Sequence, residues 1–234
     1  MNANLDTQPS GTIAVFGGTG QQGRSVVDAL LSRSARVRAL VRNPESDRAR
    51  ALADRGVELA RIEIGDAASL SAALKGADAF FFMTTPEGHS LADIEGETRQ
   101  GLALVDAAVA AAVPHVVYSS VGGAERDSGV PHFESKRRVE EHLQQSGLRA
   151  TVVRPVAFMA SSSPARPLFG AKFIVAWDRC RGQPPRVVRS IISAYASSAP
   201  LPYERWCGAK NPPSSPTVTH RASSSALSAY MPGV

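Results

Sequence analysis

Residues 12 to 24 read TIAVFGGTGQQGR, and this stretch decides the fold of the chain. Ile13 to Phe16 are apolar and β-prone, the following glycines have a G-x-x-G-x-x-G spacing, and an amphipathic helical pattern begins directly after them. Because glycine lacks a Cβ atom, such a turn can be sharp, and its backbone N–H groups can approach a pyrophosphate at the positive end of the helix. The order strand, glycine turn, helix is typical of dinucleotide-binding folds; the alternative is a glycine-rich turn without a ligand.

Strand-like and helix-like patterns continue to alternate after this turn. The run 77–83 (ADAFFFM) is apolar apart from Asp78, as in a strand buried on both faces, whereas 88–96 is polar and is interpreted as a mobile loop. Strands separated by helices at this spacing favour right-handed βαβ crossovers, so we predict an α/β fold with one doubly wound parallel sheet of the Rossmann class. The expected strands cover 13–16, 36–41, 57–64, 77–83 and 115–119. The first expected helix begins directly after the glycines, with Val26, Val27, Leu30 and Leu31 as its apolar positions. Further helices are expected over 46–55, 69–75 and 98–112, the last with Leu102, Val105 and Val109 as its buried stripe.

Two residues at strand ends indicate which dinucleotide would bind. Arg42 ends the second strand, where NAD-selective proteins usually have an acid for the ribose 2′-hydroxyl. An arginine there suits a 2′-phosphate, and such a charge-assisted contact contributes about 1.5–3 kcal/mol; the alternative is a solvated surface arginine. Asp66 follows the third strand, where it could meet the adenine ring, cap the next helix, or do both. The sequence predicts a preference for NADP(H), with NAD(H) as the alternative.

The formal net charge of +5 belongs to the end of the chain. Residues 1 to 159 carry 17 Lys and Arg against 19 Asp and Glu, whereas residues 160 to 234 carry 9 against 2. A basic tail can attract nucleic acid electrostatically. No recognition helix or aromatic-basic alternation accompanies it, so we expect no nucleic-acid partner.

The cysteine content and the longest apolar run bear on compartment and membrane contact. Cys180 and Cys207 are too isolated to indicate a zinc site or a disulfide framework, which fits a reducing compartment. Residues 1 to 11 are polar and lack a signal pattern, so we expect a disordered arm. The apolar run 102–117 is interrupted by Asp106 and Pro114 and is too short to span a membrane. We therefore predict a cytoplasmic protein with no metal site and no membrane contact.

A second group of motifs follows the fifth strand. The segment VVYSSVGG (116–123) ends that strand, and HFESK (132–136) stands at the head of the next helix. Together with GGTGQQG (17–23), the Arg42 strand end, Gly65-Asp66 and VRPVAFM (153–159), these motifs resemble the NmrA-like proteins, an atypical branch of the short-chain dehydrogenase/reductase superfamily. The resemblance covers residues 12 to 159 and implies an NAD(P)-binding Rossmann domain.

The resemblance also identifies a substitution at a catalytic position of the wider superfamily. There, a serine at the strand end and a Tyr-x-x-x-Lys pair on the next helix carry out hydride transfer; the tyrosine donates the proton and the lysine holds the nicotinamide ribose. In this chain His132 occupies the tyrosine position and Lys136 remains. His132 is either a proton carrier or a surface histidine without chemistry. Lys136 is expected to position the cofactor, the alternative being a solvated helix lysine.

The resemblance further implies a set of contacts along the dinucleotide. The pyrophosphate would lie on the glycine turn, the 2′-phosphate at the end of the second strand, and the adenine at the end of the third. Family members often have Asn or Glu just after the Phe158 position, where this chain has Met159-Ala160, so the nicotinamide end departs more from the family pattern. The implied residues are Gly17, Gly18, Thr19, Gly20, Gln21, Gln22 and Gly23 for the pyrophosphate, Arg42 and Asn43 for the 2′-phosphate, Asp66 and Ala67 for the adenine, and Thr84, Thr85, Pro86, Lys136, Ala157, Phe158 and Met159 for the nicotinamide half.

From Ala160 the composition changes abruptly. Residues 160 to 234 hold 10 of the 16 prolines, both tryptophans and 13 serines. Only 168–177 and 187–195 carry enough apolar residues for short elements, and Pro/Ser-rich segments bury too little apolar surface to offset their ordering entropy. We expect an aberrant or largely disordered tail in place of the family's small substrate lobe. It is either the product of a frameshift near codon 160, or a diverged lobe or functional disordered tail.

Three functions are compatible with these features. The first, which we favour, is an NADP(H)-binding protein that senses the nicotinamide pool and acts through a protein partner; the phosphate-binding end and the missing tyrosine support it. The second is an NAD(P)H-dependent reductase of small carbonyl or quinone-type substrates, which would use Lys136 with Ser119 and Ser120 and, in one version, His132. The third is a nonfunctional product that has lost its lobe. Substrate-specificity residues and the oligomeric state do not follow from this sequence.

Overall fold

The computed structural model describes residues 11–159 and 170–178, and of residues 156–159 and 170–178 it describes the backbone. These residues form strands and helices in alternation. In chain order, the elements are β1 (Thr12–Phe16), α1 (Gln21–Leu31), β2 (Arg36–Val41), α2 (Asp47–Ala53), β3 (Glu58–Arg61), α3 (Ala67–Leu74), β4 (Ala79–Met83), α4 (Leu91–Ala110), β5 (Val116–Ser119), α5 (Pro131–Gln145), β6 (Ala150–Met159) and β7 (Gly170–Asp178).

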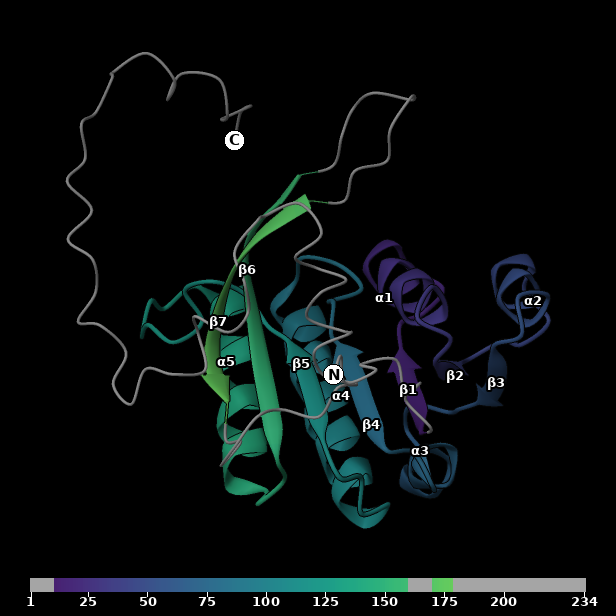
Figure 1. Ribbon diagram of the computed structural model, residues 1–234. Helices are drawn as coiled ribbons and strands as arrows, with labels where there is room; N and C mark the ends of the chain where they lie inside the picture. Colours follow the sequence, from purple (N-terminus) through teal and green to yellow (C-terminus); the bar gives the residue numbers. More distant parts are fainter. Residues whose placement is uncertain (1–10, 160–169, 179–234) are drawn as a thin grey trace, which may run out of the picture. The chain divides into compact units, whose positions relative to one another are not determined.

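The strands form one sheet in the order β3-β2-β1-β4-β5-β6-β7 (Figure 1). The strands β1 to β6 run parallel, and β7 pairs antiparallel with β6. The strand order reverses between β1 and β4, which is the switch point where open α/β sheets bind ligands beyond the carboxyl ends of the strands. The predicted doubly wound sheet is confirmed, with an antiparallel strand added at one edge.

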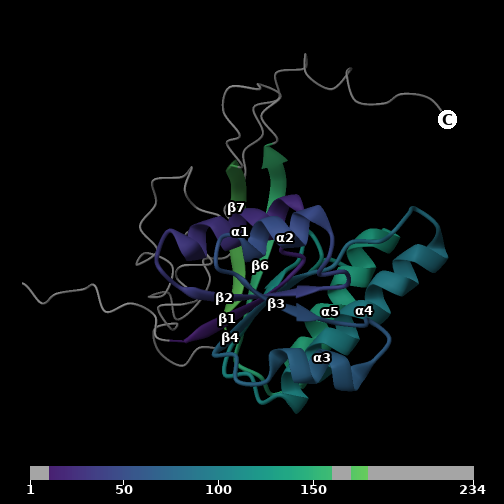
Figure 2. The ribbon, with the colours of Figure 1, turned by 90° about the vertical axis from the view of Figure 1, so that its right-hand side faces the viewer.

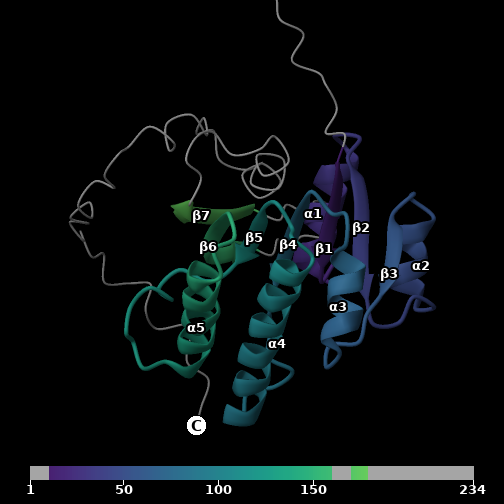
Figure 3. The same cartoon turned by 90° about the horizontal axis from the view of Figure 1, so that it is seen from below.

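Helices cover both faces of this sheet. Figure 2 shows α1 and α2 on one face and α3, α4 and α5 on the other. In Figure 3 α4 lies between α3 and α5, and α4 contacts both of these helices. Two helical layers around a parallel sheet are the arrangement that right-handed βαβ crossovers produce.

The centre of the sheet is strongly apolar. Phe80, Phe81 and Phe82 of β4 are completely buried, as expected for a strand covered on both faces. The ring of Phe82 stacks on Tyr118 of β5 with 4.6 Å between ring centroids. This packing holds β4 and β5 together at the centre of the sheet. The polar residues of the candidate site lie at the carboxyl ends of the central strands.

The main difference from the sequence prediction is the start of α4. The segment 88–96 was expected to be a mobile loop, but α4 begins at Leu91. Ser90 and Asp93 form a capping box: the Asp93 N–H donates to Ser90 Oγ at 3.2 Å, and the Ser90 N–H donates to Asp93 Oδ2 at 3.0 Å. Because two N–H groups at the helix start are satisfied in this way, the polar segment forms the first turns of a helix.

The buried face of α4 also differs from the predicted stripe. Val105 is buried as predicted, but Val109 is 44% exposed, and Leu104 and Ala108 are buried instead. The strand β3 is shorter than predicted, and β7 lies where the sequence indicated a short element. The predictions for the N-terminal arm and for most of the tail fall on 1–10, 160–169 and 179–234, which lie outside the described residues.

Candidate functional site

The glycine turn joins β1 to α1 at the switch point of the sheet. The Gly20 N–H donates to the Gly17 carbonyl at 2.9 Å, and Gly20 is the N-cap of α1. A glycine cap offers no side-chain oxygen, so it does not satisfy the N–H groups of the first helical turn. These donors and the positive end of the helix dipole are suited to an anion.

The third glycine of the motif is required by packing within the turn itself. A Cβ atom on Gly23 would lie 2.1 Å from the Gly17 carbonyl oxygen. Any other residue would therefore push the first turn of α1 away from the end of β1. The sequence motif and the geometry of the turn agree at this position.

A cavity of about 260 Å³ opens beside the turn, at the carboxyl ends of β1, β2, β3 and β4. Its wall is apolar where the strands end and polar where the turn and the loops approach. Of the residues that the sequence assigned to the cofactor, six line it: Gly17, Thr19, Gly20, Gln21, Arg42 and Thr85. The other lining residues are Phe16, Leu40, Val41, Ile62, Ile64, Met83, Glu87 and Gln100.

Arg42 and Glu87 come from different elements and lie close together at this cavity. The Arg42 Nη1 atom is 3.5 Å from Glu87 Oε1, and the two side chains are 71% and 85% exposed. Exposed ion pairs of this kind contribute little and exchange readily with other ions. Arg42 therefore remains accessible to an anionic ligand at the mouth of the cavity.

Three residues assigned to the adenosine half have local structural roles. The Asn43 side chain accepts the Glu45 N–H at 2.9 Å, in the turn that leads into α2. Asp66 is the N-cap of α3 and accepts the Ala68 N–H at 2.9 Å. Ala67 begins that helix and is exposed. The capping role of Asp66 is confirmed, and its contact with adenine stays a prediction.

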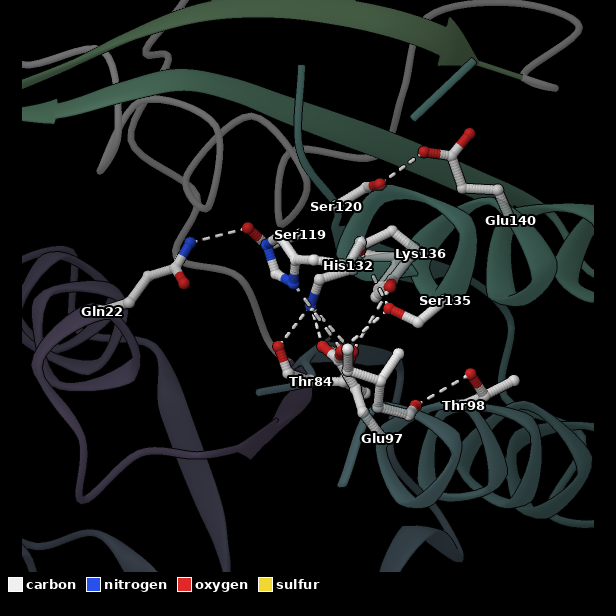
Figure 4. Close-up of polar contacts among 12 residues, drawn as sticks. Gln22, Thr84, Glu97, Thr98, Ser119, Ser120, His132, Ser135, Lys136 and Glu140 are labelled. Atoms are coloured by element: carbon white, nitrogen blue, oxygen red, sulfur yellow. Dashed lines mark hydrogen bonds and ion pairs between the residues drawn. The ribbon is translucent and has the colours of Figure 1, made fainter. Parts of the chain in front are cut away.

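The other end of the site is a buried cluster around Lys136. This lysine lies on α5, and its Nζ atom is 2.6 Å from Glu97 Oε1 of α4. The same ammonium donates to the backbone carbonyl of Thr84 and, at 2.9 Å, to Thr84 Oγ1. Glu97 and Thr84 are also buried, and Figure 4 shows the three side chains converging between α4, α5 and the end of β4.

This arrangement engages every proton of the Lys136 ammonium. An ammonium group has three N–H donors, and three acceptors of the protein stand around it: Glu97 Oε1, the Thr84 carbonyl and Thr84 Oγ1. Burial lowers the pKa of Lys136, and the Glu97 carboxylate opposes that shift. Lys136 is thus a buried, paired cation, and the alternative of a solvated helix lysine is wrong.

Glu97 receives further hydrogen bonds that fix its orientation. The Ser135 hydroxyl donates to Glu97 Oε2 at 2.8 Å, and the Thr84 hydroxyl donates to Glu97 Oε1 at 3.1 Å. His132 is more peripheral: its ring is 45% exposed, and Nδ1 lies 3.9 Å from Glu97 Oε2. His132 thus stands at the solvent edge of the cluster.

The two serines at the end of β5 are both hydrogen-bonded within the protein. Ser119 Oγ accepts Gln22 Nε2 at 2.6 Å, so a residue of the glycine motif points toward the lysine end of the site (Figure 4). Ser120 donates to Glu140 at 2.5 Å, and Glu140 also binds the guanidinium of Arg154. The Ser120 proton is thus engaged by Glu140, whereas Ser119 serves as the acceptor of its hydrogen bond with Gln22.

Tyr118 is a phenol close to the cluster. Its hydroxyl is 3.4 Å from Thr84 Oγ1, and the side chain is completely buried under the sheet end. Burial raises the pKa of Tyr118 far above its ordinary value, so the phenol stays protonated. A buried phenol that does not ionise supports packing rather than proton exchange.

The structure therefore places the predicted residues in different surroundings. The turn, Arg42 and Thr85 border the cavity, whereas Thr84 and Lys136 belong to the buried cluster. Pro86 is half-buried beside them, and Ala157, Phe158 and Met159 lie on β6, where the backbone alone is described. The sequence reasoning missed Glu97 and Glu87, for which no local motif gave a signal. Over the described ranges 11–159 and 170–178, no group of acidic, His or Cys side chains could hold a metal, and no helix is long and apolar enough to cross a membrane.

Known proteins are similar to this chain in sequence and in fold. The chain matches the model of the NmrA-like family over residues 9–174, a match that continues past residue 159 into β7. Among curated relatives, it is 37% identical over 150 residues to the NmrA-like family domain-containing oxidoreductase himF of Aspergillus japonicus. That match covers 62% of this chain and 45% of the relative.

Two solved structures are similar at comparable coverage. The NADPH-dependent quinone oxidoreductase QOR2 of Escherichia coli, complexed with NADPH, has a TM-score of 0.54 at 30% identity, covering 61% of this chain and 48% of that one. NmrA, described as a negative transcriptional regulator, has a TM-score of 0.52 at 28% identity, covering 61% and 44%. The chain thus spans about half the length of the proteins it matches.

Proposed function

The chain belongs to the NmrA-like family, and we propose that it is an NADP(H)-binding protein that responds to the nicotinamide pool and acts through a protein partner. The observation that carries this proposal is the contrast between the two ends of the site. The cavity, the glycine turn and Arg42 are accessible, while the ammonium of Lys136 is buried and engaged by Glu97 and Thr84.

The residues at the cavity fit the phosphates of a dinucleotide. The helix start at Gly20 offers N–H donors without a side-chain cap, and the close packing at Gly23 keeps that helix start next to the end of β1. The apolar strand ends, including Ile62 and Met83, suit an adenine ring. We propose that the glycine turn binds the pyrophosphate, with the strand ends around the adenosine.

Arg42 supports a preference for NADP(H) over NAD(H). Its guanidinium is exposed at the mouth of the cavity, where a 2′-phosphate could form a bidentate contact that NAD(H) cannot make. Glu87 is the group that this phosphate would displace from Arg42. Breaking an exposed ion pair costs little, so the exchange favours the phosphate.

The lysine end favours a regulatory role. Lys136 donates its three protons to Glu97 and Thr84, Ser119 accepts from Gln22, and His132 stands half-exposed at the edge. When bound, a nicotinamide cofactor would supply a hydride. The described residues would hold and orient it, with the Lys136 ammonium committed to Glu97 and Thr84.

A reductase is the second candidate, and the names of the similar proteins favour it. The relative himF is named an oxidoreductase and QOR2 a quinone oxidoreductase that depends on NADPH. Reduction of a quinone-type substrate can draw its proton from water, so an engaged Lys136 does not exclude it. In that case the protein's part would be to position the cofactor next to the substrate.

Parallel titrations of the purified chain with NADPH and NADH, followed by fluorescence, test the proposal. We expect saturable binding of NADPH that is at least tenfold tighter than that of NADH. Absence of binding to both would contradict the proposed function. The NADPH complex is then mixed with a panel of quinones and azo dyes: steady NADPH oxidation favours the reductase, and bound but unconsumed NADPH favours the regulator.

A further inference from the structure

Glu97 is a completely buried carboxylate that does not line the cavity proposed for the dinucleotide. It lies on α4 and contacts Lys136 and Ser135 of α5 and Thr84 at the end of β4. Taking a carboxylate and an ammonium out of water is costly, and the cost is offset only where geometry and hydrogen bonding are good. Such a pair beside a binding site calls for an explanation beyond stability.

We propose that Glu97 is a positioning residue for the nicotinamide half of the site. It holds Lys136 against Thr84, and the lysine in turn fixes the carboxyl end of β4. In this arrangement the backbone at the end of β4 faces the ligand, and the Lys136 ammonium does not. The proposal rests on the proposed binding of a dinucleotide. It differs from what the family resemblance implies for Lys136, which is a direct contact with the nicotinamide ribose.

The contacts of Thr84 show why its position matters. Thr84 is held at both its carbonyl and its hydroxyl by Lys136. Thr84 and the next two residues along the chain, Thr85 and Pro86, are the part of this loop that the family resemblance assigns to the nicotinamide half. A displacement of Thr84 would therefore move the segment proposed to contact the nicotinamide half. Glu97 and Lys136 act on the ligand through this loop.

The packing of the two helices brings the pair together. Gly101 lies one turn beyond Glu97 on α4, and a Cβ atom there would be 2.3 Å from Cγ2 of Val139 on α5. The missing side chain lets α4 approach α5 closely. The short distance between Glu97 and Lys136 is thus built into the helix pair and does not depend on the flexibility of two long side chains.

Three variants distinguish positioning from direct contact: Glu97→Gln, Lys136→Met, and the double variant with both changes. The matched control is Glu95→Gln, because Glu95 also bridges α4 to α5, through Arg138 at 3.0 Å, but on the surface. Each protein is titrated with NADPH, with NADH, and with adenosine 2′,5′-bisphosphate, which carries the adenosine half and both of its phosphates but no nicotinamide.

If Glu97 positions the site through Lys136, each single variant weakens NADPH and NADH by about tenfold, the typical effect of removing the support of a binding group. The double variant binds no more weakly than the singles, because residues that act as a unit are not additive. Adenosine 2′,5′-bisphosphate binds all variants within about twofold of the parent, and Glu95→Gln changes nothing.

Other outcomes overturn the proposal in different ways. Weak binding in Lys136→Met with normal binding in Glu97→Gln would mean that the lysine contacts the ligand directly. An equal loss for the dinucleotides and for adenosine 2′,5′-bisphosphate would mean that Glu97 only stabilises the fold. If Glu97→Gln does not fold, the double variant provides the test, because it leaves no unpaired charge buried between α4 and α5. Affinity for NADPH and NADH equal to that of the parent in the double variant contradicts the proposal. Failure of the parent chain to bind any of the three probes would contradict the proposed function itself.

Discussion

The two ends of the site are built in opposite ways. The phosphate end consists of a contiguous turn and one exposed arginine, and its ion pair, between Arg42 and Glu87, is open to solvent. The lysine end consists of buried side chains from β4, α4 and α5, and its ion pair, between Lys136 and Glu97, is almost inaccessible. The first end is arranged to exchange partners with a ligand, whereas the second is arranged to stay as it is.

Energetics sharpen this contrast. An exposed ion pair typically contributes about 0.2–1 kcal/mol, whereas removing one member of a buried pair costs about 3–5 kcal/mol, because the remaining charge is left in a poorly solvated site. Substitutions at the lysine end should therefore act on stability first. Substitutions at the phosphate end should act on ligand choice.

The largest effect is expected for Glu97→Gln, which leaves the Lys136 ammonium buried without its counter-charge. We expect a loss of about 3–5 kcal/mol in the free energy of unfolding at neutral pH, measured by urea denaturation. The surface variant Glu95→Gln should lose less than about 1 kcal/mol. Equal losses in the two variants would show that the buried and exposed pairs do not differ as described.

The same variant should change how stability depends on pH. Burial holds the folded-state pKa of Lys136 below its ordinary value, so between those two values the unfolded chain binds more protons and stability rises with pH. Without Glu97 the pKa of Lys136 in the folded protein falls further, so burial of this lysine destabilises the folded state more strongly at neutral pH. Stability should then rise with pH over a wider pH interval, which ends near the ordinary lysine pKa of about 10. Glu97 and Thr84 contact Lys136, while Tyr118 and His132 lie next to Thr84 and Glu97 respectively; burial keeps the Tyr118 phenol neutral over this range. A Glu97→Gln profile parallel to that of the parent from pH 7 to 10 would contradict this explanation.

The second largest effect is expected for Gly23→Ala, at the phosphate end. The new Cβ would meet the Gly17 carbonyl oxygen at 2.1 Å, and the three nearest atoms are all backbone atoms of Gly17 and Gly18, so no flexible side chain can give way. We expect a cost of about 1–3 kcal/mol in stability and at least a tenfold loss of affinity for NADPH and NADH alike. Gly18→Ala is the control for sterics within the protein, because its Cβ would make only ordinary contacts of 3.5 Å or more. A stable Gly23→Ala protein would mean that the turn is not rigid.

The difference between the two ends also explains what could be predicted from the sequence. The sheet, the turn and Arg42 follow from local patterns: an apolar run, glycines at fixed spacing, and a charge at a strand end. Glu97 does not, because nothing in LADIEGETRQ distinguishes it from the exposed Glu95. Its burial depends on the register of α4, which the Ser90 capping box sets and which places Glu97, Gly101 and Ala108 on the buried face. Interpreting this segment as a loop concealed that register, and with it the partner of Lys136.

Arg42→Ala should change ligand choice without a large change in stability. Loss of the guanidinium removes the group proposed to bind the 2′-phosphate, so NADPH affinity should fall by about ten- to a hundredfold toward that of NADH. Affinity for NADH should change by less than about threefold, because NADH has no group that needs Arg42. Titration of the variant with both nucleotides checks this; a parallel fall in both affinities would assign Arg42 to the wall of the cavity rather than to the phosphate.

The smallest effect is expected for Glu87→Gln, which tests whether the exposed pair exchanges as described. Glu87 competes with the 2′-phosphate for Arg42, so the Glu87→Gln variant should bind NADPH up to about fivefold more tightly, in keeping with the energy of an exposed ion pair. NADH affinity should not change, and the gain should shrink at high salt, because screening weakens exposed charges. The gain should also vanish when Arg42→Ala is present in the same chain. A gain in NADPH affinity that survives the Arg42→Ala substitution would mean that Glu87 acts on the ligand directly and does not compete with the 2′-phosphate for Arg42.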